Sequence, residues 1–389
     1  MKWGIICLTT SVKIMIVRAF NQTVQNDFFK EKVIVIIGAR QVGKTTAVRD
    51  LINAQGEVAK YLNGDEADLY PIFKKPTSTQ LKSLIGEAKI LVVDEAHQIP
   101  NIGKALKLIV ETFPDIQIIA TGSSSFDIGN RVNEPLTGRK FEYQMYALSA
   151  NELVSHFGIL EEKRMLEHRL IFGTYPEIVT HLGDEPRLLK NLVSSYLYRD
   201  VLQLDGLKKP SLLTALLSAL AYQIGSEVSI NELAQLTGSN SHTVEKYLDL
   251  LEKSFVIYKL RAFNRNLRNE LKKSQKVYFL DNGVRNAILG NFNLVQQRTD
   301  VGPLWENYLM VERMKKQEYS GFYGKRFFWR TTQNQEIDLI EDIDGKLSAF
   351  EFKWNPKSKW DKIPRSFTNS YPDAYTEVIT PENYLDFLI

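Results

Sequence analysis

The first 150 residues alternate between short apolar runs and amphipathic segments. The apolar runs have the length and the β-branched content of buried strands; they are residues 33–37, 59–63, 89–95, 116–121 and 141–148. The amphipathic segments have the periodicity of helices; they are residues 46–53, 81–86 and 101–112. Because parallel strands are joined by helical crossovers, this alternation predicts an α/β domain over residues 15–150, with a parallel sheet between layers of helices.

Helical periodicity dominates the next part of the chain. Residues 151–208 are expected to form a helical linker that covers the first domain as a lid. In residues 209–276 an apolar helix is followed by two further helices and a strand, which is the order of a winged-helix domain. The first of those two helices has an N-cap at Ser229, an acidic residue three positions later at Glu232, and a glycine at its end, Gly238.

Residues 277–389 are expected to form a small α/β domain. An amphipathic helix at 304–317 precedes three strand-like runs at 327–330, 336–340 and 346–353. The sequence Asp-Ile-Asp-Gly at 342–345 is typical of a hairpin turn between the last two strands.

Composition places the chain among ordinary globular proteins. It has 389 residues, a formal net charge of +3 and a single cysteine, Cys7, so a disulfide framework is excluded and a reducing cytoplasm is expected. No apolar run is long enough to cross a membrane. Residues 1–14 lack the cleavage site of a signal peptide, and we interpret them as a non-structural extension in front of Met15.

The segment after the first apolar run fits a phosphate-binding loop. Four of its residues match the fixed positions of the pattern G-x-x-x-x-G-K-[ST], between a strand and a helix as that pattern requires. Its glycines let backbone N–H groups and the helix N-terminus approach polyphosphate oxygens. Lys44 is expected to reach the β- and γ-phosphates as a catalytic residue, and Thr45 to bind Mg²⁺. The residues expected to bind ATP are Gly38, Ala39, Arg40, Gln41, Val42, Gly43, Lys44, Thr45 and Thr46.

Two acidic residues end the strand at 89–95. A carboxylate at the carboxyl end of a strand beside a phosphate-binding loop can hold Mg²⁺, and we assign this role to Asp94. The adjacent Glu95 is then placed to polarise the attacking water as the catalytic base. The alternative is a solvated acidic strand end without a ligand.

Two further residues are candidates for contact with the γ-phosphate. Ser123 follows the strand at 116–121, and ligands of doubly wound sheets lie outside the carboxyl ends of the strands. Arg139 could stabilise the transferred phosphoryl group, in cis or in trans from a neighbouring copy of an oligomer. A Ser/Gly loop and an ordinary surface arginine are the respective alternatives.

These features resemble the AAA-like P-loop ATPases that carry a catalytic glutamate after the strand-end aspartate. More closely, the chain is similar to a widespread bacterial and archaeal ATPase family in which this domain precedes a helical segment and a C-terminal domain of unknown function. The resemblance extends over nearly the whole chain from Met15 onward, and it implies that ATP and Mg²⁺ are cofactors. The matching stretches are residues 38–46, 91–100, 120–125, 136–139, 173–177, 302–307, 336–339 and 350–353.

The C-terminal strands carry a pattern that resembles the restriction-endonuclease-like fold. It consists of Glu306, Asp338 and the tripeptide Glu351-Phe352-Lys353. Period-two alternation places Glu351 and Lys353 on one face of a strand, and the hairpin can bring Asp338 beside them. The resemblance implies a second metal site formed by Glu306, Asp338 and Glu351, with Lys353 as the catalytic lysine. An inactive fold used for binding or regulation is the alternative.

Positive charge is concentrated at the end of the winged-helix segment. Residues 255–276 contain seven basic residues against one acidic residue, a net charge of +6. Such a stretch is typical of contact with a DNA backbone, although the acidic residues of the preceding helix do not suit base recognition. A module that docks another protein or domain explains the pattern equally well.

The first functional hypothesis is a cytoplasmic Mg²⁺-dependent ATPase, coupled to a DNA-binding, nuclease-like domain. The alternative is a slow ATP-dependent switch that recruits DNA or a protein partner through a non-catalytic C-terminal domain. A kinase acting on small molecules is disfavoured, because a glutamate at position 95 suits activation of water rather than transfer to an acceptor.

Overall fold

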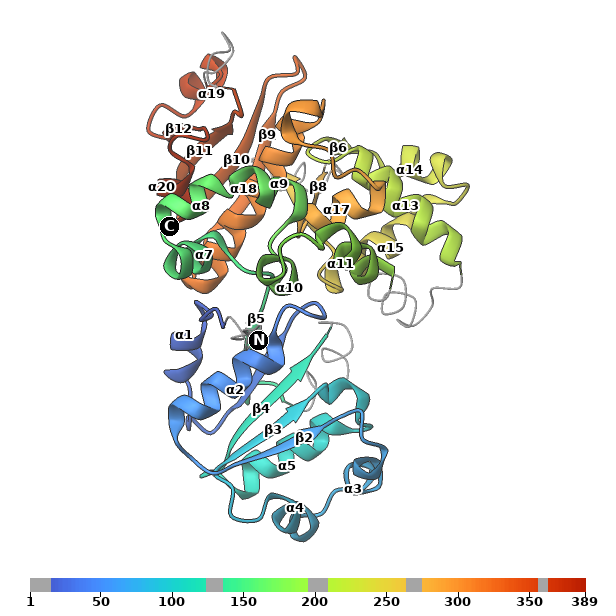
Figure 1. Ribbon diagram of the computed structural model, residues 1–389, viewed down its shortest axis with the longest axis vertical. Helices are drawn as coiled ribbons and strands as arrows, with labels where there is room; N and C mark the ends of the chain where they lie inside the picture. The colour runs from blue at the N-terminus through green and yellow to red at the C-terminus, as the bar shows by residue number, and fades with distance from the viewer. Residues whose placement is uncertain (1–14, 124–135, 195–208, 264–274, 356–362) are drawn as a thin grey trace, which may run out of the picture.

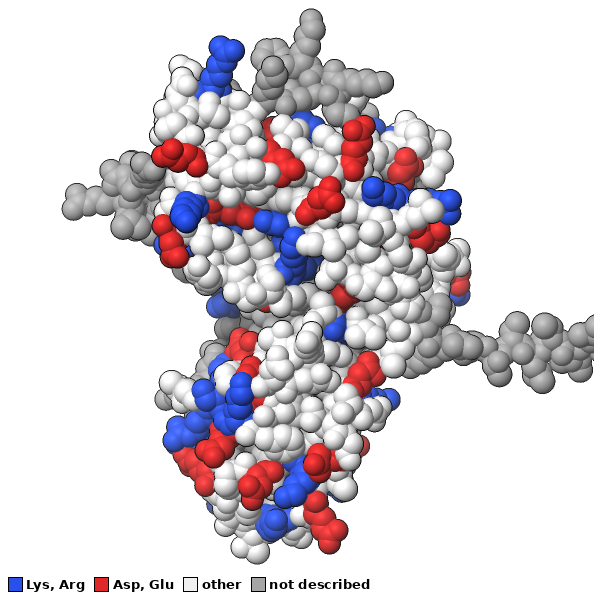
Figure 2. Space-filling model, turned by 90° about the vertical axis from the view of Figure 1, so that its left-hand side faces the viewer, with Lys and Arg blue, Asp and Glu red and all other residues white. Residues whose placement is uncertain are grey.

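The chain folds into two bodies of unequal size. The computed structural model describes residues 15–123, 136–194, 209–263, 275–355 and 363–389, so the predicted extension 1–14 lies outside the described residues. The smaller body, which contains the first sheet, lies below the larger one in Figure 1. On the face shown in Figure 2, a narrow waist separates the bodies, and acidic and basic side chains are interspersed over both.

The smaller body is built on a parallel sheet of strand order β2-β3-β4-β1-β5. Its strands are β1 (Val33–Ile37), β2 (Ala59–Asn63), β3 (Ile90–Asp94), β4 (Gln117–Gly122) and β5 (Lys140–Gln144). Its helices are α1 (Asn21–Gln25), α2 (Lys44–Gln55), α3 (Tyr70–Lys74), α4 (Ser78–Ile85) and α5 (Ile102–Thr112). Strands β1, β3 and β4 are buried throughout, as their apolar runs predict. The predicted parallel α/β domain is therefore confirmed.

The last strand of this sheet is shorter than predicted. Strand β5 ends at Gln144 rather than at residue 148. Residues 145–149 instead leave the sheet and connect the two bodies. Their apolar side chains are buried, which explains why the sequence continues with strand-like periodicity beyond the end of the strand.

Short helices begin the larger body. The helical linker predicted over residues 151–208 begins with three short helices, which are separated at Gly158 and Met165. The helices between the two sheets are α7 (Ala150–Phe157), α8 (Ile159–Arg164), α9 (Leu166–Phe172), α10 (Pro176–Thr180), α11 (Glu185–Leu192), α13 (Pro210–Tyr222), α14 (Ile230–Leu236) and α15 (Ser241–Lys253). They pack on the larger body, with α10 next to the smaller one (Figure 1). A role of this region as a lid stays a prediction.

A seven-stranded mixed sheet runs through the larger body in the order β12-β11-β10-β9-β7-β8-β6. Its strands are β6 (Glu227–Val228), β7 (Ile257–Ala262), β8 (Gln275–Phe279), β9 (Lys325–Arg330), β10 (Glu336–Ile343), β11 (Lys346–Phe352) and β12 (Tyr375–Ile379). Strands β7 and β9 join its two halves through only two paired positions, Arg261–Phe327 and Ala262–Phe328. The division predicted after residue 276 falls inside β8, so the two segments predicted as a winged helix and as a C-terminal domain contribute strands to one sheet.

The long helix α18 (Val301–Tyr319) is the core of the larger body. Its Trp305 is fully buried and makes edge contacts with Trp354 and Tyr384. The remaining helices of this body are α17 (Asn282–Leu289), α19 (Arg365–Ser370) and α20 (Tyr384–Leu388). Within the described ranges, no helix is both long enough and apolar enough to cross a membrane.

The buried side chain of Asn307, on α18, forms hydrogen bonds with the backbone of Phe279 at the end of β8. The Asn307 amide accepts from the backbone N–H of Phe279 and donates to its carbonyl, both at 2.8 Å. It also donates to Asn282 Oδ1 at 2.7 Å. Asn307 therefore satisfies both backbone groups at the end of this strand.

We expect Asn307→Ala to lower the free energy of unfolding by on the order of 3 kcal/mol, because it leaves buried backbone groups of Phe279 without a partner. Urea denaturation followed by tryptophan fluorescence measures this change. Asn293→Ala, at an exposed position, is the control and should have little effect. Equal stability of the two variants would contradict this account of Asn307.

Candidate functional site

The phosphate-binding loop lies between the end of β1 and the start of α2. Gln41 and Gly43 have positive φ angles of 61° and 95°, and Gly43 is the N-cap residue of α2. A Cβ at Gly38 would lie 2.1 Å from the carbonyl oxygen of Met145, so only glycine fits there. The Lys44 ammonium donates to the carbonyls of Gly38 and Ala39, each at 2.9 Å. The Lys44 ammonium therefore lies at the loop that is predicted to bind phosphate.

Hydroxyl groups from three elements converge on the carboxylate of Asp94. Thr45 donates to Oδ2 at 2.8 Å, Tyr61 donates to the same oxygen, and Thr121 donates to Oδ1. Burial alone would raise the pKa of Asp94, but these hydrogen bonds and the charge of Lys44 outweigh it and lower the pKa. Asp94 is therefore ionised at neutral pH and lies beside Thr45, the pair predicted to bind Mg²⁺.

Glu95 has a different environment from its neighbour. Its backbone adopts the left-handed conformation, with φ 48°, and its N–H donates to Thr121 Oγ1 at 3.1 Å. Its Oε2 lies 3.3 Å from His97 Nδ1. Burial, reinforced by the charge of Asp94, raises the pKa of Glu95 despite the opposing charges of Lys44 and Arg40. The two adjacent acids thus divide into a permanent anion and a carboxylate more able to accept a proton.

The structure brings Ser123 to the predicted site but not Arg139. Ser123 is buried directly after β4, where Gly38 N–H donates to the Gly122 carbonyl at 3.2 Å. Arg139 instead precedes β5, its carbonyl accepts from Val33 N–H, and its side chain pairs with Glu111 at 2.9 Å. Val33 is the first residue of β1, so at about 3.3 Å per residue Arg139 lies roughly 17 Å from the phosphate-binding loop. This placement does not suit a role in cis, and the role in trans stays a prediction.

Two residues of this site were not predicted from the sequence. Thr121 is a polar residue near the end of a strand that is buried throughout, which is a signal that could have identified it. Tyr61 lies on β2, and its pairing with Asp94 depends on the neighbouring positions of β2 and β3 in the sheet. No local pattern in the sequence indicates that contact.

The four predicted C-terminal residues also lie together. Glu306 comes from α18, Asp338 from β10 and Glu351 from β11, and the hairpin register pairs the adjacent positions Leu339 and Phe350. Asp338 Oδ2 accepts from the Phe352 N–H at 2.8 Å, and Glu351 Oε1 accepts from Lys353 at 2.6 Å. The predicted proximity is therefore present in the structure.

An unpredicted lysine lies among these acids. Lys276 is 1 % exposed, and its ammonium lies 2.8 Å from Glu306 Oε1, in contact with Glu336 and 3.7 Å from Asp338 Oδ1. Burial opposes its charge, but Glu306 and the other acidic neighbours raise the pKa of Lys276 well above its ordinary value. Among the described residues, no group of three or more His, Cys, Asp or Glu side chains is arranged to hold a metal ion. The second metal site that the resemblance implies therefore stays a prediction.

Two of these acids are shifted toward their neutral forms. Burial raises the pKa of Glu306 to about 7, against the influence of Lys276. Burial and the charge of Asp338 raise the pKa of Glu351 to about 8, and its Oε2 is buried without a hydrogen-bond donor.

The basic stretch 255–276 is only partly available to a nucleic acid. Of its seven basic residues, Lys259 pairs with Asp249 and Glu252, and Lys276 is buried among acids. Arg261 is exposed. The other four lie outside the described residues; they are Arg265, Arg268, Lys272 and Lys273.

Three family models match consecutive parts of the chain. Residues 30–154 match an AAA domain. Residues 163–294 match a domain of unknown function (DUF8612), and residues 301–384 match another (DUF4143). The AAA match coincides with the sheet, loop and acidic pair described above.

Curated relatives share most of the chain's length. An uncharacterized protein of Mycobacterium tuberculosis, Rv2008c, is 24% identical over 346 residues, which are 88% of this chain and 74% of that protein. An uncharacterized protein of Haemophilus influenzae is 26% identical over 355 residues, 85% of this chain and 84% of that protein.

Solved structures resemble the backbone more distantly. The Walker-type ATPase PABY2304 of Pyrococcus abyssi is 14% identical, with a TM-score of 0.49, over 70% of this chain and 94% of that one. The RuvB Holliday junction branch migration motor of Thermotoga maritima is 17% identical, with a TM-score of 0.28, over 58% of this chain and 81% of that one. The family match over residues 30–154 and the geometry of the loop together support an AAA-like P-loop fold for this part of the chain.

Proposed function

We propose that the protein hydrolyses ATP with Mg²⁺ and uses its nucleotide state to control a C-terminal unit that binds a partner without cutting it. The observation that carries the first part is the convergence of Lys44, Thr45, Asp94 and Glu95 at the carboxyl ends of β1 and β3. Asp94 is ionised, and the adjacent Glu95 can accept a proton. Activation of water next to a metal-bound phosphate requires these two properties side by side.

The side chains of this site have separate tasks in the proposed reaction. Lys44 exchanges its contacts with the Gly38 and Ala39 carbonyls for phosphate oxygens. Thr45 and Asp94 would hold Mg²⁺, which, when bound, neutralises charge on the β- and γ-phosphates. Glu95 accepts a proton from the attacking water, and Ser123 orients the γ-phosphate.

The proposed role of the C-terminal unit depends on Lys276. Mg²⁺ needs oxygen ligands at about 2.1 Å, and a cation so close to Glu306 Oε1 would be repelled by the ammonium that already contacts this oxygen. The same oxygen also accepts from Tyr278 OH at 2.8 Å. The cluster of Glu306, Asp338 and Glu351 therefore suits a fixed ion-pair network better than a metal centre.

A metal-dependent nuclease coupled to ATP hydrolysis is the second candidate function. The proximity of Asp338, Glu351 and Lys353 in a β-hairpin favours it, since those residue types form metal sites in the fold that the sequence resembles. For either candidate, the element order α13, β6, α14, α15, β7 and β8 supports our interpretation of residues 209–276 as a winged helix. DNA and a protein are both candidates for the partner.

We expect Lys44→Ala to weaken ATP binding roughly 10- to 100-fold, because it removes a charge-assisted contact with the phosphates. Glu95→Gln should bind ATP as the wild type does but lower kcat about 10²- to 10⁴-fold, because it removes the proton acceptor. Isothermal titration calorimetry and release of inorganic phosphate measure the two effects. Unchanged turnover in Glu95→Gln would exclude Glu95 as the base.

The pKa of Glu95 also predicts a pH profile for kcat. A base must be ionised to act, and burial raises its pKa above the ordinary 4.5. The rate should therefore fall as the pH decreases through a value above about 4.5, while Asp94, whose pKa is lowered, stays ionised. The residual rate of Glu95→Gln, measured over the same range, should lack this decline.

We expect Lys276→Met to increase the affinity of the nucleotide-free protein for Mn²⁺ at least about tenfold, because it removes a positive charge from among the carboxylates. The paramagnetic resonance signal of free Mn²⁺ reports binding. Lys259→Met is the matched control, since Lys259 lies on the adjacent strand and also pairs with two acids. Adding Asp338→Asn should abolish the gain.

The opposite result would favour the nuclease. Binding of Mn²⁺ by the wild type, lost in Asp338→Asn and accompanied by metal-dependent cleavage of DNA, would contradict a non-catalytic C-terminal unit. Circular dichroism of Lys276→Met establishes that the variant is folded.

A further inference from the structure

Arg18, which precedes the first strand, contacts the phosphate-binding loop and the helices α7 and α18. Arg18 is 5 % exposed. Its Nη1 donates to the Val42 carbonyl at 2.7 Å, its Nη2 to the Tyr146 carbonyl at 2.6 Å, and its Nε to Glu152 Oε1 at 2.8 Å. A planar guanidinium holds such contacts in a fixed mutual geometry, which a lysine cannot do.

The loop end of this arrangement lies against the start of α2. Val42 precedes Gly43, and a Cβ built on Gly43 would lie 3.8 Å from Arg18 Nη1 and 3.9 Å from Pro176 Cγ of α10. The peptide between Val42 and Gly43 is part of the backbone expected to surround phosphate. A shift of that peptide on phosphate binding must therefore move Arg18 or break its bond to Val42.

The opposite end of the guanidinium has a rigid acceptor. Glu152 is the third residue of α7, and its Oε2 accepts from Ser149 N–H at 2.8 Å within a capping box. Its Oε1 also accepts from Ala19 N–H at 2.7 Å. The carboxylate is consequently fixed to the helix terminus, and a displaced Arg18 acts on α7 as a whole.

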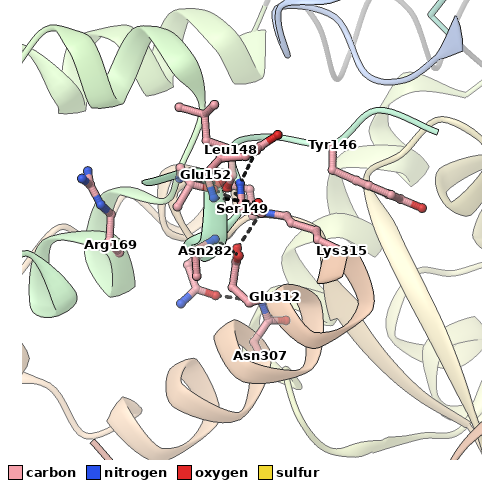
Figure 3. Close-up of polar contacts among 12 residues, drawn as sticks. Tyr146, Leu148, Ser149, Glu152, Arg169, Asn282, Asn307, Glu312 and Lys315 are labelled. Carbon is pink, nitrogen blue, oxygen red and sulfur yellow. Dashed lines mark hydrogen bonds and ion pairs between the residues drawn. The ribbon is translucent and has the colours of Figure 1, made fainter. Parts of the chain in front are cut away.

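The same arginine contacts the last turn of α18. Tyr319 OH lies 3.4 Å from Arg18 Nη2 and accepts from Tyr146 N–H at 3.1 Å. Two more residues on this face of α18 hold the segment that joins the bodies: Lys315 donates to the Leu148 carbonyl at 3.1 Å, and Glu312 accepts from Ala150 N–H at 2.6 Å (Figure 3). Residues 146–150 are therefore bound to α18 at successive points.

The other end of α18 carries the acidic cluster. Glu306 precedes Tyr319 by thirteen residues, which at 1.5 Å per residue is about 20 Å along the helix axis. Glu306 contacts Lys276, and the adjacent Asn307 holds β8. One continuous helix thus connects the surroundings of the phosphate-binding loop with the centre of the C-terminal unit.

We propose that Arg18 is a positioning residue that fixes the Val42–Gly43 peptide and transmits its nucleotide-dependent movement to α18 through Tyr319. This inference rests on the proposed binding of ATP. The loop and the last turn of α18 both contact the buried guanidinium of Arg18. Because this group is closely packed, only a few positions of the loop are compatible with each position of the helix end. Nucleotide binding then changes the relative stability of these arrangements in both bodies.

Hydrogen–deuterium exchange of the full-length protein tests this transmission. We expect saturating amounts of a non-hydrolysable ATP analogue with Mg²⁺ to change the exchange rate of the amides at 312–319 at least about twofold in the wild type. Arg18→Met and Tyr319→Phe should abolish that change. Tyr319→Phe should leave the affinity for the analogue within about twofold, because Tyr319 does not contact the loop itself.

Arg169→Met is the matched control for loss of a buried arginine. Arg169 pairs with Glu162 at 2.8 Å and is as buried as Arg18, but it contacts α8 rather than the phosphate-binding loop. This variant should keep the exchange response of α18. If Arg18→Met does not fold, Arg18→Lys keeps the charge without the planar fork and should also lose the response.

Each contrary outcome has a distinct meaning. Failure of the wild type to bind the analogue would overturn the proposed function and this inference with it. Binding without any change at 312–319 would overturn the inference alone, as would a wild-type response in Tyr319→Phe. Loss of the response in Arg169→Met as well would reduce Arg18 to a general contributor to stability and would likewise overturn the proposal.

Discussion

The rest of the structure depends on one buried ion pair, between Arg18 and Glu152, where the two bodies meet. Arg18 and Glu152 form an ion pair with side-chain exposures of 4 % and 1 %. Removal of one member of such a pair leaves a buried charge without compensation, which typically costs several kcal/mol. Both members also bond to backbone groups, so the pair determines where the phosphate-binding loop, α7 and α18 lie relative to one another.

The nucleotide site and the C-terminal cluster use opposite solutions for their carboxylates. Asp94 is surrounded by hydroxyl donors that keep it charged. Glu306 has an ammonium within the protein as its counterion. The first arrangement relies on hydroxyl groups, whereas the second has a cationic partner inside the folded chain.

Local signals predicted the features that are contiguous in the sequence. The strand before Gly38 and the acids at the end of β3 follow from apolar runs and fixed spacings, and the strand order places them together. Arg18 and Lys276 were not predicted, because their partners are more than twenty residues away and no periodic pattern marks an arginine or lysine as buried. Arg139 matched a motif by type, but its position before β5 places it at the other end of the strands.

The join between β7 and β9 has a mechanical consequence. Only two paired positions connect the half-sheet of β6, β7 and β8 with that of β9 to β12, whereas β10 and β11 pair over five. Under a pulling force across this join, few backbone hydrogen bonds share the load, so it separates before the longer ladders on either side of it. Tension between α15 and the end of the chain would therefore be borne less by the sheet than by the packing of α17 and α18 against it.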